Sequence, residues 1–146
     1  MVHALKFRSA IALAALMAEQ IVGALPPRAF PPDGALVPVP ASRMRRRQRG
    51  FDQADLLASE LSRLVVLPLQ RPLKRQAAVA SGQRGLGRSE RLSGRGLKVS
   101  ATREAAVRVV LIDDVCTTGA TLELCAKALL AGKTESVSAI TYCSVH

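Results

Sequence analysis

A chain of 146 residues and 15.5 kDa has the size of one ordinary domain, and its 49% hydrophobic and 22% charged residues argue against a disordered or fibrous protein. Its formal net charge of +10 indicates an anionic partner, which is nucleic acid, an acidic membrane surface or a phosphorylated small molecule. With no Trp, one Tyr and three Phe, the chain has few rings on which single-stranded nucleic acid could stack.

The N-terminal segment predicts an amphipathic helix that packs on a core. Its apolar run, Ile11–Ala18, is too short to cross a bilayer and ends at Glu19. Apolar residues at helical spacing form one face, made of Leu13, Leu16, Met17, Ile21 and Ala24. Because Lys6 and Arg8 precede the run, a weak secretory signal is the alternative interpretation. We expect the helix and no membrane partner.

The cysteines indicate the redox compartment. Cys116, Cys125 and Cys143 are odd in number and form no CxxC pair, so they predict neither a disulfide framework nor a four-cysteine zinc site. We expect three reduced thiols and a cytoplasmic location.

The next segment alternates strands and helices. Ala35–Pro40 predicts a short strand, and Ser42–Gly50, with five arginines, predicts a basic loop. Phe51–Leu64 has helical spacing, and Val65–Leu69 is a second candidate strand. From Gln70 to Arg95 the apolar pattern is lost among glycines and arginines. This segment is either a mobile loop that covers a phosphate or a solvated linker, and composition does not decide between them.

The last third predicts a strand, a helix and a strand. Val107–Ile112 is the near-continuous β-branched run of a strand buried on both faces. Thr121–Ala131 is helical, with Gly132 after it, and Ser136–Tyr142 is the second strand. A βαβ unit of this length implies a parallel sheet, so the predicted fold class is α/β.

The chemistry lies between that buried strand and its helix. Asp113 and Asp114 are costly to bury unless hydrogen-bond donors, such as two adjacent sugar hydroxyls, satisfy them. The following Thr117–Thr121 segment offers three hydroxyls and a glycine before a helix N-terminus, which suits a phosphate. The pair therefore predicts a ribose-phosphate site. The alternative is a helix cap followed by ordinary turn residues. Neither a P-loop nor a GxGxxG dinucleotide motif is present.

Two resemblances support that site. Val109–Thr121 resembles the thirteen-residue motif with which type I phosphoribosyltransferases bind phosphoribosyl pyrophosphate (PRPP). From about residue 4 to the end, the chain resembles the ComF family of competence-associated, phosphoribosyltransferase-like proteins. The motifs that carry this second resemblance are Lys6-Phe7, Val37–Pro40, Arg49–Ala54 and Gln83–Arg91. No segment can supply the N-terminal zinc ribbon of many members.

The resemblance implies one phosphoribosyltransferase-like domain, 1–146, with a parallel sheet flanked by helices. Its parts are an N-terminal helix and connector (1–34), a flexible basic loop (70–95) and the strand, PRPP loop, helix and strand unit (107–142). Asp113 and Asp114 would hold the ribose hydroxyls and act in catalysis. The PRPP-binding residues would be Asp113, Asp114, Val115, Cys116, Thr117, Thr118, Gly119, Ala120 and Thr121. The pyrophosphate loop would contain Ser42 and Arg43, and the flexible loop Lys74, Arg75, Arg84, Arg88 and Arg91.

The resemblance also implies an activity. The protein would bind PRPP with Mg²⁺, which Asp113 and Asp114 could help to hold, and would transfer the phosphoribosyl group to an unidentified nitrogenous acceptor. The alternative is a non-catalytic accessory protein of DNA uptake that binds PRPP or nucleic acid, with DNA binding through Arg45–Arg47. The sequence leaves the acceptor, nucleic-acid association and a homodimer open.

Overall fold

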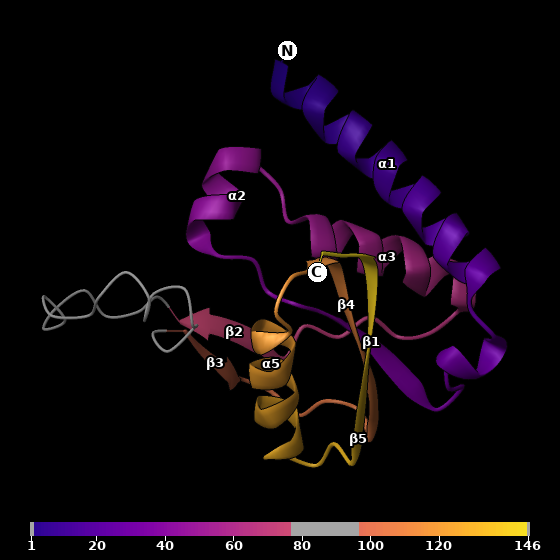
Figure 1. The fold of residues 1–146 in the computed structure, drawn as a ribbon, viewed down its shortest axis with the longest axis vertical. Helices are drawn as coiled ribbons and strands as arrows, with labels where there is room; N and C mark the ends of the chain where they lie inside the picture. The colour runs from indigo at the N-terminus through magenta and orange to yellow at the C-terminus, as the bar shows by residue number, and fades with distance from the viewer. Residues whose placement is uncertain (1, 77–96, 146) are drawn as a thin grey trace, which may run out of the picture.

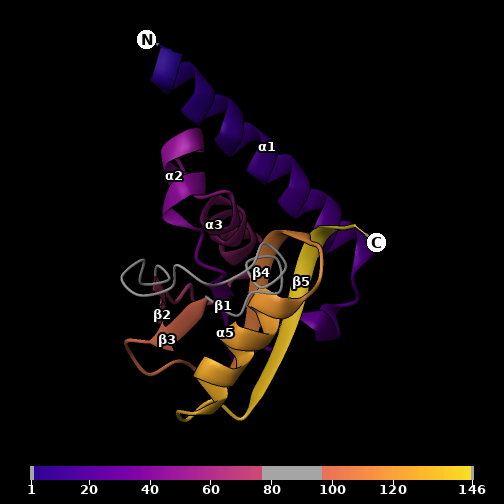
Figure 2. The same ribbon diagram turned by 60° about the vertical axis from the view of Figure 1, so that its left-hand side comes forward.

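The protein folds as an α/β domain in the computed structural model, which describes residues 2–76 and 97–145. In chain order the elements are α1 (Val2–Ala24), the 3₁₀ turn η1 (Pro27–Ala29), β1 (Gly34–Pro38), α2 (Arg43–Arg49), α3 (Gln53–Val65), β2 (Leu73–Gln76), β3 (Lys98–Ala101), β4 (Arg108–Cys116), α5 (Ala120–Leu130) and β5 (Ser136–Ser144). Figures 1 and 2 show their arrangement.

The sheet is parallel and has the order β1-β4-β5, with β4 in the centre. Leu36 of β1 lies opposite Val110, and Ile112 lies opposite Ile140 of β5. β2 and β3 form a separate antiparallel pair. The predicted fold class, a parallel sheet flanked by helices, is confirmed.

The central strand β4 contributes to two hydrophobic cores. Successive side chains of a strand point to opposite faces of the sheet, so Val110 and Ile112 pack with α1 and α3, whereas Val109 and Leu111 pack with α5. Figure 1 shows α1 and α3 on one face of the sheet and α5 on the other. All four β4 side chains are at most 1% exposed, as a strand covered on both faces requires.

The N-terminal helix differs from its prediction in length and in its buried face. α1 has 23 residues, and an 18-residue window of it has a mean hydropathy of 1.3, so by length and composition alone it is long and apolar enough to cross a membrane, which the run Ile11–Ala18 is not. Its buried residues are Ala10, Ala14, Met17, Ala18 and Ile21, and the last three share a core cluster with residues of α3. The predicted face is therefore only partly right, because Leu13 and Leu16 are each 52% exposed. Small alanines, Ala10, Ala14 and Ala18, are buried on this helix instead.

Two further predictions between β1 and β2 are wrong. The arginine-rich segment is the helix α2 rather than a loop, because the Ser42 hydroxyl accepts from the Arg45 N–H and Gly50 ends the helix with φ of +74°. Val65–Leu69 is no strand, because Val65 ends α3 and the segment touches the sheet only through a bridge between Leu69 and Leu36.

Candidate functional site

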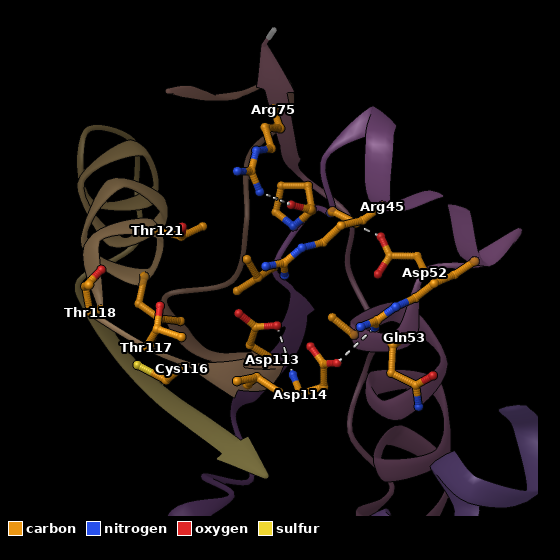
Figure 3. A pocket seen from close by; sticks show the side chains of 18 of the residues that line it. Arg45, Asp52, Gln53, Arg75, Asp113, Asp114, Cys116, Thr117, Thr118 and Thr121 are labelled. Carbon is orange, nitrogen blue, oxygen red and sulfur yellow. Dashed lines mark hydrogen bonds and ion pairs between the residues drawn. The ribbon is translucent and has the colours of Figure 1, made fainter. Parts of the chain in front are cut away.

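A cleft opens at the carboxyl ends of β1 and β4, where an open parallel sheet usually binds ligands. Its floor is the acidic end of β4, one wall is the loop that enters α5, and the other wall comes from α2, the start of α3 and the end of β2 (Figure 3). The cleft is lined by Val39, Pro40, Ala41, Arg45, Arg49, Phe51, Asp52, Gln53, Ala54, Arg75, Asp113, Asp114, Val115, Cys116, Thr117, Thr118, Gly119, Thr121 and Leu122.

The two acids of the floor lie inside β4 and not after it as the sequence suggested. Pairing with β5 continues past them, with Asp113 opposite Thr141 and Cys116 opposite Ser144. Both aspartates are partly buried, and the Asp114 N–H donates to the Asp113 carboxylate over 2.9 Å. Pairing with β5 includes Asp113 and Val115 but not Asp114 between them, and both carboxylates line the cleft, where Figure 3 shows them side by side.

Burial changes the acidity of one carboxyl. Removal from water raises the pKa of Asp113 from 3.8 to about 7, and the neighbouring Asp114 adds to the rise. The Asp114 N–H and the nearby Arg45 act in the opposite direction. A buried carboxyl with a raised pKa reduces the stability of the fold when it is charged. Such carboxyls in clefts are typical of functional sites.

The wall opposite the arginines is rich in hydroxyls. Thr117, Thr118 and Gly119 connect β4 to α5, and Gly119 has a φ of +78°, a conformation that favours glycine. The Ala120 N–H donates to the Thr118 hydroxyl over 3.3 Å. Figure 3 shows Thr117, Thr118 and Thr121 on the α5 side of the cleft, away from Arg45 and Asp52. The loop thus brings hydroxyls and the N-terminal end of an eleven-residue helix to the cleft.

Three arginines from two distant segments form the cationic wall. Arg45 and Arg49 come from α2, and Arg75 comes from β2. Arg49 Nη1 lies 3.4 Å from an Asp114 carboxylate oxygen, and Arg75 Nη1 donates to the Pro40 carbonyl over 3.4 Å. Burial lowers the pKa of Arg75, and the charge of Arg45 lowers it further. Two cations held this close together are suited to a polyanionic group between them.

The structure brings together most of the predicted site residues. Of the predicted PRPP-binding set, only Ala120, the first residue of α5, is absent from the cleft lining. Ser42 caps α2, and Arg43 lines a separate shallow depression with Met44, Arg47 and Gln48. Lys74 is exposed on β2. Arg84, Arg88 and Arg91 lie outside the described residues.

Several lining residues were not predicted from the sequence. Arg45 and Arg49 are four residues apart on one face of α2, and this spacing between Ser42 and Gly50 is the signal that could have found them. Asp52 begins α3 and accepts from the N–H groups of Asp55 and Ala41, each over 3.3 Å. It thereby holds the chain before α2 against the start of α3.

The donor set suits a metal ion that arrives with a phosphorylated ligand. Within residues 2–76 and 97–145, no group of three or more His, Cys, Asp or Glu side chains could hold a metal ion. Mg²⁺ usually takes one or two protein carboxylates together with water and phosphate oxygens. Asp113 and Asp114 can provide that share.

Comparison with known proteins identifies relatives. No family model matches the sequence. The chain is 37% identical to competence protein F of Haemophilus influenzae over 99 residues and 40% identical to competence protein ComFC of Bacillus subtilis over 108. These matches cover 65% and 73% of this chain, but only 43% and 42% of the relatives. It is 32% identical to DNA utilization protein YhgH of Escherichia coli K12 over 150 positions, covering 98% of this chain and 65% of that protein.

The matches agree with the motifs found in the sequence and with the α/β fold. Two of these relatives carry the competence name, and the match to the third extends over almost the whole chain. The chain belongs to the ComF family of competence-associated proteins.

Proposed function

We propose that this protein binds PRPP together with Mg²⁺ and transfers the phosphoribosyl group to a nitrogenous acceptor, releasing pyrophosphate. The observation that carries the proposal is the arrangement of the cleft, in which a carboxylate pair lies between a hydroxyl-rich helix N-terminus and three arginines. Each part of PRPP has a chemical counterpart there. The carboxylates accept from the ribose hydroxyls, the loop binds the 5-phosphate, and the arginines face the pyrophosphate.

The proposed reaction needs charge stabilisation rather than a covalent intermediate. The bond between C1 of the ribose and pyrophosphate breaks, a C1–N bond forms, and the acceptor nitrogen gives its proton to solvent. The pyrophosphate leaves with the electron pair of the broken bond. Arg45 and Arg75 stabilise that developing negative charge, and Asp113 and Asp114 hold the ribose in place. When bound, Mg²⁺ neutralises part of the pyrophosphate charge.

Calorimetry with the full chain tests the binding step. Titration of Mg²⁺-PRPP is expected to give saturable heat, and Asp114→Asn is expected to weaken binding at least about tenfold, because it removes a charge-assisted hydrogen bond worth about 1.5–3 kcal/mol. Asp33→Asn is the matched control, since Asp33 is exposed and pairs with Arg108 at the opposite ends of the strands. Absence of saturable heat from the unmodified protein at millimolar Mg²⁺-PRPP would overturn the proposal.

The catalytic step has its own test. Pyrophosphate release is measured from PRPP with a panel of purines, pyrimidines and small amines. Release that depends on one acceptor class supports transfer. Saturable PRPP binding without release from any acceptor favours a protein that binds PRPP but does not turn it over.

A second candidate function is binding of nucleic acid as an accessory in DNA uptake. The relatives' names include competence and DNA utilization, and one surface of α2 fits such a role. Arg43 and Arg47, one turn apart, line the depression that lies apart from the cleft, and no residue of α2 is buried. This outer arginine pair can contact phosphates while Arg45 and Arg49 face the cleft.

The outer arginine pair gives the second candidate a separate test. For a 20-nucleotide single strand, the R43Q/R47Q double variant is expected to bind about tenfold more weakly at low salt, with the magnitude of the slope of log K against log salt reduced by about 1.4. The charge-matched control is R63Q/R103Q, which removes two exposed arginines elsewhere. Equal losses in both double variants would show that only net charge matters and would count against the candidate.

A further inference from the structure

The short helix α2 presents two pairs of arginines in different directions. Arg45 and Arg49 line the cleft, and Arg43 and Arg47 line the separate depression. α2 is seven residues long and buries none of its side chains. The direction in which each arginine points therefore depends on its own contacts more than on packing of the helix.

Arg49 makes the contact that matters for the cleft. Its Nη1 atom lies 3.4 Å from Asp114 Oδ2, and the pair joins segments 65 residues apart in the sequence. The two partners are unequally exposed, with 49% of the Arg49 side chain in contact with solvent against 15% of Asp114. Arg49 thus contacts a carboxylate whose oxygens a ribose hydroxyl would need.

The exposure of Arg49 allows it to change partners. An exposed side chain changes rotamer within nanoseconds, and no buried contact of α2 opposes the movement. If the neutral hydroxyls of a ligand bind the Asp114 carboxylate, the Arg49 guanidinium loses its ion pair and is left hydrogen-bonded to water. A ligand that also has an anion near C1 of the ribose gives the guanidinium a new partner at the same wall as Arg45 and Arg75.

We propose that Arg49 is a specificity-determining residue that favours ribose phosphates with an anionic group at C1 over those without one. The inference rests on the proposed function, because it assumes that Asp114 receives a ribose hydroxyl. Arg49 competes with every sugar for the Asp114 carboxylate. Only a ligand with an anionic group at C1, such as PRPP, gives the displaced guanidinium a new partner. The protein thereby discriminates against ribose 5-phosphate, the sugar that remains when PRPP loses its pyrophosphate.

The experiment compares two ligands on three proteins by calorimetry. Mg²⁺-PRPP and ribose 5-phosphate are titrated into the unmodified chain, R49Q and the control R46Q, in which an exposed arginine of the same helix outside the cleft lining is changed. In R49Q, we expect PRPP to bind about tenfold more weakly and ribose 5-phosphate to bind unchanged or about threefold more tightly. R46Q should leave both affinities unchanged. Matched thermal midpoints of the three proteins show that each is folded.

The outcomes separate this inference from the proposed function. The inference is supported if the affinity for Mg²⁺-PRPP divided by the affinity for ribose 5-phosphate falls at least tenfold in R49Q but not in R46Q. Equal weakening of both ligands in R49Q, or the same ratio in R49Q and R46Q, overturns the inference while PRPP binding stands. Binding of neither ligand to the unmodified protein overturns the proposed function and the inference with it.

Discussion

Replacement of Asp113 by asparagine is expected to stabilise the free protein at pH 8 while it removes most of its affinity for PRPP. Burial, together with the neighbouring Asp114, raises the pKa of Asp113 to about 7. In the unfolded chain, the same carboxyl titrates near its ordinary value of 3.8. The folded protein therefore keeps a proton that the unfolded chain loses between these two values.

The sign of the pH dependence follows from that difference. The stability that protonated Asp113 contributes is fully present below about pH 4, and it is lost as the pH rises through the folded pKa near 7. Asparagine stays neutral, and its Oδ1 can still accept from the Asp114 N–H. The gain of Asp113→Asn at pH 8 is expected to be on the order of 2 kcal/mol, because water at the cleft reduces the cost of the charge.

Urea unfolding at pH 5 and pH 8 measures the effect. The free energy of unfolding of Asp113→Asn should exceed that of the unmodified protein at pH 8 and by much less at pH 5. Asp33→Asn, at an exposed site, should show no such trend. In calorimetry at pH 8, Asp113→Asn should bind Mg²⁺-PRPP about 10- to 100-fold more weakly, since a charge-assisted hydrogen bond to the ribose, worth about 1.5–3 kcal/mol, is lost. An asparagine variant less stable than the unmodified protein at pH 8 would contradict the assignment.

The second large effect is expected at Arg75. This half-buried side chain extends from β2 toward the cleft and donates to the Pro40 carbonyl (Figure 3). Methionine keeps much of its length and removes its charge. We expect Arg75→Met to slow pyrophosphate release 100- to 1000-fold, about the cost of losing one preorganised group that stabilises developing negative charge.

The neighbouring lysine is the matched control. Lys74 and Arg75 are successive residues of β2, so their side chains point to opposite faces, and Lys74 is exposed. Lys74→Met should therefore change release less than about threefold. Rates are taken with the acceptor that gives the fastest release in the panel, and kcat should fall by a larger factor than KM rises. Similar small effects of the two substitutions would remove Arg75 from the proposed charge stabilisation.

The parts of the fold that depend on local sequence were predicted well. The β-branched run before Asp113 is strand β4, and the predicted helix Thr121–Ala131 differs from α5 by one residue at each end. The end of β4 was not predictable, because strand pairing to β5 carries it through two aspartates and on to Cys116. α2 was missed for a different reason. A run of arginines repels itself, but arginine is a good helix former and both ends of the segment carry caps.

The site was predicted in its floor, in its loop and in one arginine of its cationic wall, Arg75, but Arg45 and Arg49 were not predicted. Asp113 and the threonines are adjacent in sequence, so their chemistry could be read from one segment. Arg45, Arg49 and Arg75 reach the cleft only because α2 folds over the strand ends and because β2 pairs with β3. Such proximity depends on tertiary packing. The sequence alone therefore suggested Ser42 and Arg43, which the structure places outside the cleft lining.

The absence of buried side chains in α2 has a consequence for how this protein can diversify. The cleft floor belongs to β4, whose neighbouring residues fill both cores, so a change there risks the fold itself. α2 supplies much of the opposite wall and contributes nothing to either core. Substitutions in α2 can therefore alter which ligands the cleft accepts at little cost in stability. For an engineer who wants to change which ligands the cleft binds, the α2 positions other than Arg45 are the ones to randomise first.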